Sequence, residues 1–222
     1  MEEYVVKILS IENITHDVNR IITEKPDGYS FIPGQATEAS VNLPKFKDKK
    51  RPFTFTSLPD WEQLEFTIKS YDDHDGVTKQ IGELKEGEEL ILREVWGSIQ
   101  YKNKGVFIAG GAGATPFIAI IRDLHKQNKL EGNKLIFSNK TSKDIILESE
   151  FSDLLGDNFI NILTREKADK YFNGHIDESF LRSQISDFNQ AFYICGPKSF
   201  VKSVNEMLTS LGADTDSVVI EK

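Results

Sequence analysis

The first hundred residues alternate between apolar and polar positions, which is the pattern of half-buried antiparallel strands. The clearest run, residues 64–69, reads LEFTIK, so its leucine, phenylalanine and isoleucine face one way and its glutamate, threonine and lysine the other. Strands at the spacing seen here, with one helix near residues 77–84, predict a small antiparallel barrel or sandwich. Similar runs predict further strands at residues 4–14, 18–23, 37–43, 53–57 and 89–93.

From Gly105 onward the pattern changes, and apolar strands alternate with helices. This rhythm predicts a parallel sheet with helices on both faces. The boundary lies between residues 97 and 104, so we expect one domain over residues 1–98 and a second over residues 102–222. The predicted strands are residues 106–109, 134–137, 159–163, 191–195 and 217–220, and the predicted helices follow Pro116 or lie near residues 144–155, 178–185 and 198–211.

The composition fits two modest globular domains. Of the 222 residues, 39% are hydrophobic and 28% are charged, which suffices for a packed core. The longest apolar stretch, residues 106–121, is interrupted by three glycines and a proline and is too broken for a membrane span. The first residues, Met-Glu-Glu, lack the basic start of a signal peptide. We therefore expect a cytoplasmic protein with no membrane segment.

Charge and metal ligands narrow the function classes. Lys and Arg number 27 and Asp and Glu 35, so the formal net charge is -8 and general nucleic-acid binding is disfavoured. The single cysteine, Cys195, cannot form an intramolecular disulfide, and the four histidines show no metal-ligand spacing, so no metal site is expected. One segment is basic although the net charge is negative. This basic segment carries Lys45, Lys47, Lys49, Lys50 and Arg51, with only Asp48 among them.

The clearest chemical signal is the segment VFIAGGAGATP at residues 106–116, where an apolar strand enters a glycine-rich turn and then a helix. Glycines let the backbone approach a pyrophosphate, whose charge the N–H groups and dipole of the next helix stabilise. Pro116 suits the first turn of that helix, where its missing N–H costs nothing. The spacing is GxGxxP and not GxGxxG, so a tight turn without a ligand is an equal alternative.

A second segment, RPFTFTS at residues 51–57, places a fixed cation, an aromatic ring and three hydroxyls close together. On a strand, Arg51, Phe53 and Phe55 share one face. The segment can pair a phosphate with Arg51, stack a ring on Phe53 and hydrogen-bond a heterocycle through Thr54. The alternative is an ordinary barrel strand with an exposed arginine.

Two further segments each have two interpretations. The sequence Asp-Gly-Val-Thr at residues 75–78 opens the predicted helix of the first half, where Asp75 or Thr78 either caps the helix or belongs to an anion site. The sequence FYICGP at residues 192–197 ends a buried strand at Cys195. Open parallel sheets bind ligands at this end of their strands, although a free cysteine is more often a small buried hydrophobe.

Together, in this order and spacing, the four segments resemble the ferredoxin–NADP reductase superfamily of flavin reductases. That family has an RxYS-type flavin segment, a glycine-rich helix start, a GGxGxTP nucleotide loop and a CGP strand end. The resemblance covers nearly the whole chain and implies an antiparallel Greek-key flavin-binding barrel followed by a parallel-sheet nucleotide-binding α/β domain. The matching residues are Arg51, Pro52, Phe53 and Thr54, then Gly76, Val77 and Thr78, then Gly110, Gly111, Gly113, Thr115 and Pro116, and finally Cys195, Gly196 and Pro197.

The resemblance also implies roles for these residues. Arg51 would pair with the flavin phosphate, Phe53 would stack on the isoalloxazine and Thr54 would hydrogen-bond near flavin N5. Residues 76–78 would hold the pyrophosphate of FAD, and the glycine loop that of NAD(P)H. Thr115 and Cys195 would border the nicotinamide during hydride transfer, which makes them the expected catalytic residues together with Thr54.

Several positions depart from the family pattern. Phe53 replaces the usual tyrosine, which keeps the ring and loses its hydroxyl, and Thr54 replaces serine and keeps the hydroxyl. The terminal aromatic that covers the flavin in plant-type members is missing from the ending VVIEK, which leaves the nicotinamide face open. Glu221 either matches a carboxylate found near that end of the sheet or is a solvated terminal residue.

The resemblance implies a monomeric NAD(P)H-dependent flavoprotein oxidoreductase that transfers hydride to bound FAD and passes electrons to a small acceptor such as flavodoxin or ferredoxin. No cysteine-rich [2Fe–2S] module is present in the sequence, so electrons must leave directly from the flavin. One alternative is a diaphorase-like reductase acting on free flavin, a haem protein or an oxygenase component. Another is a non-catalytic nucleotide-binding module that has lost the flavin.

The cofactor and the acceptor each have a sequence clue. No acidic residue follows the second strand of the nucleotide domain before Asp144, so Ser138, Lys140 and Arg165 are candidates for a 2′-phosphate, and NADPH is favoured with NADH as the alternative. The basic segment Lys45, Lys47, Lys49, Lys50 and Arg51 precedes the flavin strand, where it can steer an acidic flavodoxin or ferredoxin, unless it is simply a solvated turn.

Overall fold

The computed structural model describes residues 2–71, 76–97, 99–214 and 218–220, and the chain divides into two compact units. The first unit comprises Met1–Gln100 and Thr115–Asp123, and the second comprises Tyr101–Ala114 and Leu124–Lys222. The start of the helix after the glycine loop thus groups with the first unit, which the hydrophobic pattern does not indicate. Within the described residues, no helix has the length and apolar character needed to cross a bilayer.

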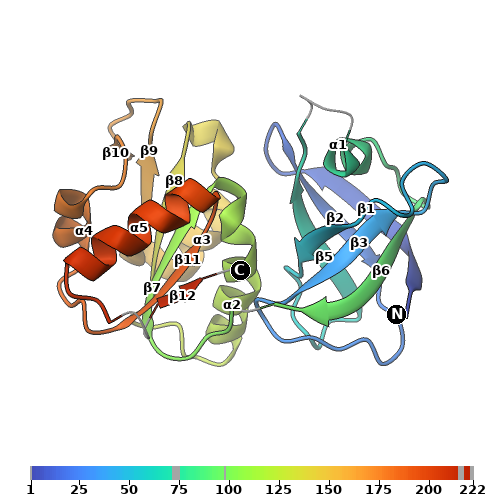
Figure 1. Ribbon diagram of the computed structural model, residues 1–222, viewed down its shortest axis with the longest axis horizontal. Coiled ribbons are helices and arrows are strands. Elements are labelled where there is room, and N and C mark those ends of the chain that lie inside the picture. Colours follow the sequence, from blue (N-terminus) through green and yellow to red (C-terminus); the bar gives the residue numbers. More distant parts are fainter. Residues whose placement is uncertain (1, 72–75, 98, 215–217, 221–222) are drawn as a thin grey trace. The chain divides into compact units, whose positions relative to one another are not determined.

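Six antiparallel strands form the sheet of the first unit, in the order β4-β3-β6-β1-β2-β5 (Figure 1). A bridge between Phe55 and Phe66 brings the two ends of this sheet together, so it closes almost completely and the predicted antiparallel barrel is confirmed. The elements of this part are β1 (Tyr4–Asn13), β2 (Val18–Glu24), β3 (Ala36–Val41), β4 (Arg51–Thr54), β5 (Gln63–Lys69), α1 (Val77–Gly82) and β6 (Glu89–Trp96).

The barrel core forms as the alternation in β5 predicts, but the opposite face of that strand differs from expectation. Its apolar residues join an aromatic cluster in which the rings of Phe31 and Phe55 stack at 4.2 Å. Glu65 was expected to face solvent and is only 3% exposed. It accepts a hydrogen bond from the hydroxyl of Thr56 and forms an ion pair with Arg122, so partners from other elements replace water around its charge.

The sheet of the second unit has six parallel strands in the order β10-β9-β8-β7-β11-β12, as its alternating pattern predicts. Its strands are β7 (Gly105–Gly110), β8 (Lys134–Asn139), β9 (Phe159–Leu163), β10 (Phe172–Asn173), β11 (Ala191–Cys195) and β12 (Val218–Ile220). Its α-helices are α2 (Thr115–Lys126, shared with the first unit), α3 (Glu148–Leu155), α4 (Glu178–Gln184) and α5 (Lys198–Ser210), and its 3-10 turns are Gly111–Ala114, Ser142–Asp144 and Gly156–Asn158.

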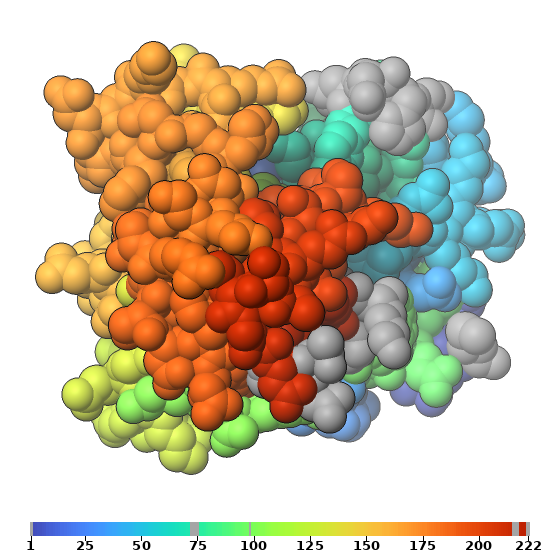
Figure 2. All heavy atoms as spheres, turned by 60° about the vertical axis from the view of Figure 1, so that its left-hand side comes forward, coloured from blue at the N-terminus to red at the C-terminus, as the bar shows by residue number. Residues whose placement is uncertain are grey.

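Helices cover both faces of this sheet. Leu181 of α4 and Leu208 of α5 pack in one cluster with strand residues such as Ile108, and the outer surface of these helices comes forward in orange and red in Figure 2. From α3, Phe151 contacts Phe159 with ring centroids 5.4 Å apart.

The expected helix over residues 144–155 begins later, at Glu148. Thr141 and Asp144 form a capping box on a separate 3-10 turn, and Leu147 then adopts a left-handed backbone with φ 51°, which interrupts the helical path. The two-residue strand β10 was not predicted, because its pattern is too short to stand out.

Candidate functional site

The glycine turn after β7 combines open space with tight packing. Gly111 has φ +53°, and a Cβ atom added there would meet nothing within 4 Å. Gly113 is different, because a Cβ atom there would lie 2.3 Å from the carbonyl oxygen of Cys195. Gly111 therefore supplies a left-handed turn beside free space, and Gly113 lets the turn lie directly against the end of β11.

The end of β11 completes this surface. Cys195 pairs with Ala109 of β7 and is 2% exposed. A Cβ atom on Gly196, whose φ is +154°, would lie 2.9 Å from a ring carbon of Phe200 and 3.2 Å from the Cα of Gly110. The structure thus brings the glycine loop and the Cys-Gly-Pro segment together at the carboxyl ends of two neighbouring strands. The expected contact between Cys195 and a nicotinamide stays a prediction.

Helix α2 begins at Thr115, immediately after the glycine turn, and Pro116 occupies its first turn as predicted. No acidic side chain lies in that first turn, whereas His125 and Lys126 lie in the last. The charges of the helix therefore complement its dipole and leave the N-terminal end favourable for an anion.

The loops after β8 and β9 contain an acidic group that sequence reasoning missed. The carboxylate of Glu166 accepts hydrogen bonds from the backbone N–H of Ser142 at 2.8 Å and from its hydroxyl at 3.0 Å. Lys140 and Arg165 are exposed; Arg165 precedes Glu166 in the chain, and its N–H donates to the carbonyl of Lys140. Ser138, expected to reach a phosphate, is buried. Only the parallel pairing of β8 with β9 reveals this carboxylate, since Glu166 lies 24 residues from Ser142.

The predicted flavin strand is β4, which pairs with β3. Arg51 and Pro52 are exposed, and the guanidinium of Arg51 donates to the carbonyl of Lys50 at 2.7 Å. Phe53 is half-buried against the barrel core, and Thr54 is 9% exposed. Phe55 is fully buried, so Phe53 is the aromatic ring of this segment that retains accessible surface.

Helix α1 begins as the glycine-rich segment predicts, but not with the expected cap. Its N-cap is Gly76, which has no side chain, and no side-chain hydrogen bond caps the helix. Thr78 therefore lies inside the helix, while Val77 is buried in the barrel core. The other candidate cap, Asp75, and the terminal Glu221 lie outside the described residues.

The lysines of the basic segment lie between β3 and β4, and Arg51 begins β4. Phe46 is buried in the barrel core, and the ammonium groups of Lys45 and Lys49 lie 5.5 and 4.9 Å from the centre of its ring. The side chains of Lys45, Lys47 and Lys49 are exposed. One buried aromatic ring thus anchors the segment and leaves its cations at the surface.

Comparisons with known proteins agree with this geometry. Residues 107–206 match the oxidoreductase NAD-binding domain family. The chain is 28% identical over 220 residues to NADH-cytochrome b5 reductase 2 of Mycosarcoma maydis, covering 88% of this chain and 62% of that protein. It is 24% identical over 232 residues to the reductase component of propane 2-monooxygenase from Rhodococcus jostii, covering 97% and 62%. The chain thus spans 62% of the length of each of these relatives.

A solved structure covers the whole fold. Ferredoxin NADP+ reductase from Neisseria gonorrhoeae, with bound FAD and NADP, superposes with a TM-score of 0.86 over 99% of this chain and 98% of that one, at 18% identity. The chain has the fold of the ferredoxin–NADP reductase superfamily. The resemblance indicated by its four segments is thereby confirmed, and the expected residue roles stay predictions.

Proposed function

We propose that this protein is an NAD(P)H-dependent flavin reductase that transfers hydride from the nicotinamide to bound FAD and passes the electrons to a small electron-transfer protein. The observation that carries the proposal is the glycine-lined surface at the ends of β7 and β11. Such a surface lets a backbone approach a pyrophosphate closely, and the same chain carries a separate set of flavin-type residues on its barrel.

The nucleotide half of the proposal rests on three features. Gly111 provides a left-handed turn beside open space, Gly113 lets the turn pack without a side chain, and Thr115 starts a helix whose dipole favours an anion. These residues would hold the pyrophosphate of the nicotinamide cofactor. Cys195 ends the neighbouring strand and would limit where the nicotinamide ring can lie.

The flavin half rests on β4 and α1. Arg51 offers an exposed cation for a phosphate, Phe53 offers a partly accessible ring, and Thr54 offers a hydroxyl for the heterocycle. The N-cap Gly76 lets a second phosphate approach the start of α1 without meeting a side chain. When bound, FAD supplies the acceptance of hydride and its release as single electrons or as a pair.

We propose NADH as the nicotinamide cofactor. The sequence favours NADPH because no acidic residue follows β8 before Asp144, but Glu166, from the loop after β9, brings a carboxylate against Ser142 of that loop. Its carboxylate lies against Ser142, in the same two loops as Lys140 and Arg165, and would there repel a 2′-phosphate. The relative from Mycosarcoma maydis carries NADH in its name, which supports the same choice.

The acceptor we propose is a small acidic electron-transfer protein that docks on the lysines of the basic segment, Lys45, Lys47, Lys49 and Lys50. The sequence favours flavodoxin or ferredoxin, whereas the names of several relatives favour cytochrome b5. The relative from propane 2-monooxygenase supports a second candidate, the reductase component of an oxygenase. The cytoplasmic location and the monomeric state expected from the sequence are part of the proposal.

The absorption spectrum of the purified protein, before and after reconstitution with FAD, tests whether the protein binds flavin. A flavin band that persists through gel filtration is expected. A chain that takes up no flavin would instead be the non-catalytic nucleotide-binding module.

Acceptor choice is tested by NADH oxidation with flavodoxin, ferredoxin or cytochrome b5 as the oxidant. The triple variant Lys47→Glu, Lys49→Glu, Lys50→Glu should lose most of its activity with the preferred carrier. Reduction of a neutral quinone should be unchanged, because charge steers only a charged partner. Equal loss with both oxidants would remove the basic segment from the docking surface.

A further inference from the structure

Arg93 is an arginine buried in the barrel, and a β-bulge turns it inward. Thr37 pairs with Val95 and Ala39 with Leu92, so Arg93 and its successor face a single residue of β3. A bulge leaves backbone groups outside the ladder, and side chains satisfy them here. The N–H of Arg93 donates to the hydroxyl of Thr37 at 3.1 Å, and its carbonyl accepts from the hydroxyl of Tyr29 at 2.7 Å.

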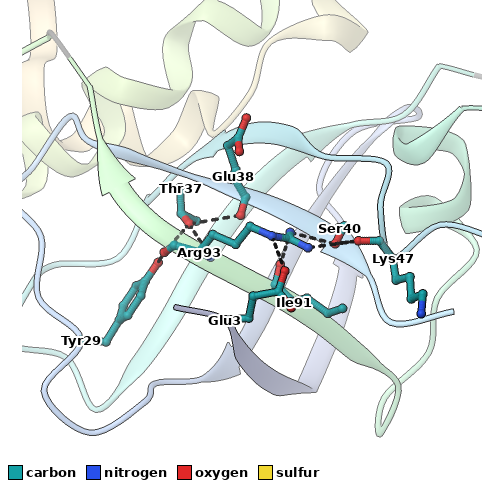
Figure 3. A network of polar contacts seen from close by, with 8 residues as sticks. All are labelled: Glu3, Tyr29, Thr37, Glu38, Ser40, Lys47, Ile91 and Arg93. Atoms are coloured by element: carbon teal, nitrogen blue, oxygen red, sulfur yellow. Dashed lines mark hydrogen bonds and ion pairs between the residues drawn. The ribbon is translucent and has the colours of Figure 1, made fainter. Parts of the chain in front are cut away.

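The side chain of Arg93 is 2% exposed, and its guanidinium reaches Glu3, Ser40 of β3, the carbonyl of Ile91 and, at Lys47, the loop of the basic segment (Figure 3). Nη2 donates to the carbonyl of Lys47 at 3.0 Å, and Nη1 donates to the hydroxyl of Ser40 at 2.9 Å. That hydroxyl donates in turn to the same Lys47 carbonyl at 2.7 Å. On its other side, Nε donates to the carboxylate of Glu3 at 2.8 Å.

The Lys47 carbonyl therefore accepts from two donors on different strands, in the middle of the basic segment. Backbone hydrogen bonds shape the same loop, from the N–H groups of Phe46 and Lys47 to Leu43 and from Lys49 to Phe46. Several cations within so few residues repel one another and favour an open loop. The buried guanidinium of Arg93 holds the Lys47 carbonyl and opposes that opening. A lysine in its place would lack the planar set of N–H donors that reaches several acceptors at once.

We infer that Arg93 is a positioning residue for electron transfer: with Ser40, it holds the Lys47 carbonyl so that the lysines of this loop form a preorganised docking surface for the acidic acceptor. The inference rests on the proposed function, because it concerns the docking of that acceptor. An arginine that only filled the barrel would need no bond to this loop, and an apolar residue would fill the same space without the cost of burying a charge. Preorganisation reduces the ordering cost at binding, so the effect belongs in the affinity for the acceptor and not in the chemistry.

Three single variants of the full-length protein separate this role from a purely structural one. Arg93→Lys keeps the positive charge and loses the planar guanidinium with its several N–H donors. Ser40→Ala removes the second donor to Lys47 and leaves the arginine in place. Glu3→Gln is the matched control. It weakens a hydrogen bond of the same guanidinium, but Glu3 does not belong to the loop.

Hydrogen exchange gives a readout that is independent of catalysis. The amides of Phe46, Lys47 and Lys49 should exchange about tenfold faster in Arg93→Lys and Ser40→Ala than in the natural protein, and amides of β5 should not change. Glu3→Gln should match the natural protein. Unchanged exchange of the loop amides in both of the first two variants overturns the inference.

Steady-state kinetics with NADH and cytochrome b5 tests whether Arg93 and Ser40 increase the affinity for the acceptor. We expect KM for cytochrome b5 to rise about threefold to tenfold in Arg93→Lys and Ser40→Ala with a weaker dependence on salt, while kcat stays within about twofold. Turnover of a neutral quinone should be unchanged. An equal loss with both oxidants overturns the inference, because it would report general damage to the barrel.

The two proposals fail in different ways. A protein that reduces cytochrome b5 normally in all three variants retains the proposed function and overturns the role of Arg93. A protein that binds no flavin overturns the proposed function and, with it, the docking role.

Discussion

The glycine-lined surface of the second unit and the buried charges of the first unit are built in opposite ways. In the second unit, the surface at the ends of β7 and β11 depends on missing side chains, because a Cβ atom on Gly113 or Gly196 would collide with its neighbours. In the first unit, the features that distinguish the barrel are buried charges, Glu65 and Arg93, each satisfied by groups from other strands or loops. The glycine surface is therefore sensitive to an added atom at Gly113 or Gly196, and the barrel is sensitive to the loss of a partner of a buried charge.

The largest effect should follow from removing a partner in the barrel. Glu65→Ala leaves the guanidinium of Arg122 and the hydroxyl of Thr56 without their carboxylate and should lower the free energy of unfolding by about 3–5 kcal/mol. The control Glu62→Ala removes an exposed acidic residue and should change it by less than about 0.5 kcal/mol. Urea denaturation measures both. Equal values for the two variants would contradict the buried ion pair.

The next effect tests the opposite kind of site. Gly113→Ala should displace the glycine turn from the end of β11, and kcat/KM for NADH should fall by about tenfold or more, since small misplacements near a reaction are costly. Gly156→Ala is the control, because Gly156 lies away from the glycine turn and its Cβ enters open space, so it meets only backbone strain of about 1 kcal/mol. If Gly156→Ala reduces kcat/KM as much as Gly113→Ala does, close packing against Cys195 is not the reason for the effect at Gly113.

A third prediction concerns pH and the phenol of Tyr29, which donates to the backbone of Arg93. Burial raises the pKa of Tyr29 to about 12 from its ordinary value of 10.0. The neutral phenol is thus favoured in the folded state, and its contribution is complete below pH 10 and is lost as the pH rises toward 12. The loss should be roughly 2–3 kcal/mol.

Thermal melting between pH 9 and pH 12 checks this expectation. Tyr29→Phe should be less stable than the natural protein at pH 9 by about 1 kcal/mol, through loss of the hydrogen bond to Arg93. Its stability should then fall less steeply with pH. Parallel curves for the two proteins would show that another group controls the alkaline transition.

The smallest effect belongs to cofactor choice. Glu166→Gln removes the negative charge that lies against Ser142 and should shift the ratio of kcat/KM values toward NADPH by roughly fivefold, which corresponds to about 1 kcal/mol. Glu178→Gln removes an exposed charge from α4 and should leave the ratio unchanged. A ratio that is the same in both variants would remove Glu166 from cofactor selection.

The sequence predicts the backbone features of this protein better than its buried charges. The strand alternation and the run from Val106 to Pro116 are local patterns, and the structure has both, although the strand expected at residues 53–57 is β4 at Arg51–Thr54. The environments of Glu65, Arg93 and Glu166 depend on partners far away in the chain, such as Arg122 for Glu65 and Ser142 for Glu166. Periodicity assigns a face to each residue but cannot say what covers that face.

The most direct test of the proposed function is anaerobic mixing of the FAD-reconstituted protein with NADH while the flavin absorbance is followed. We predict rapid bleaching of the flavin band, slower or weaker bleaching with NADPH, and recovery of the band when an electron-transfer protein is added. A flavin that is bound and stays oxidised with both nicotinamide cofactors would contradict hydride transfer in this protein.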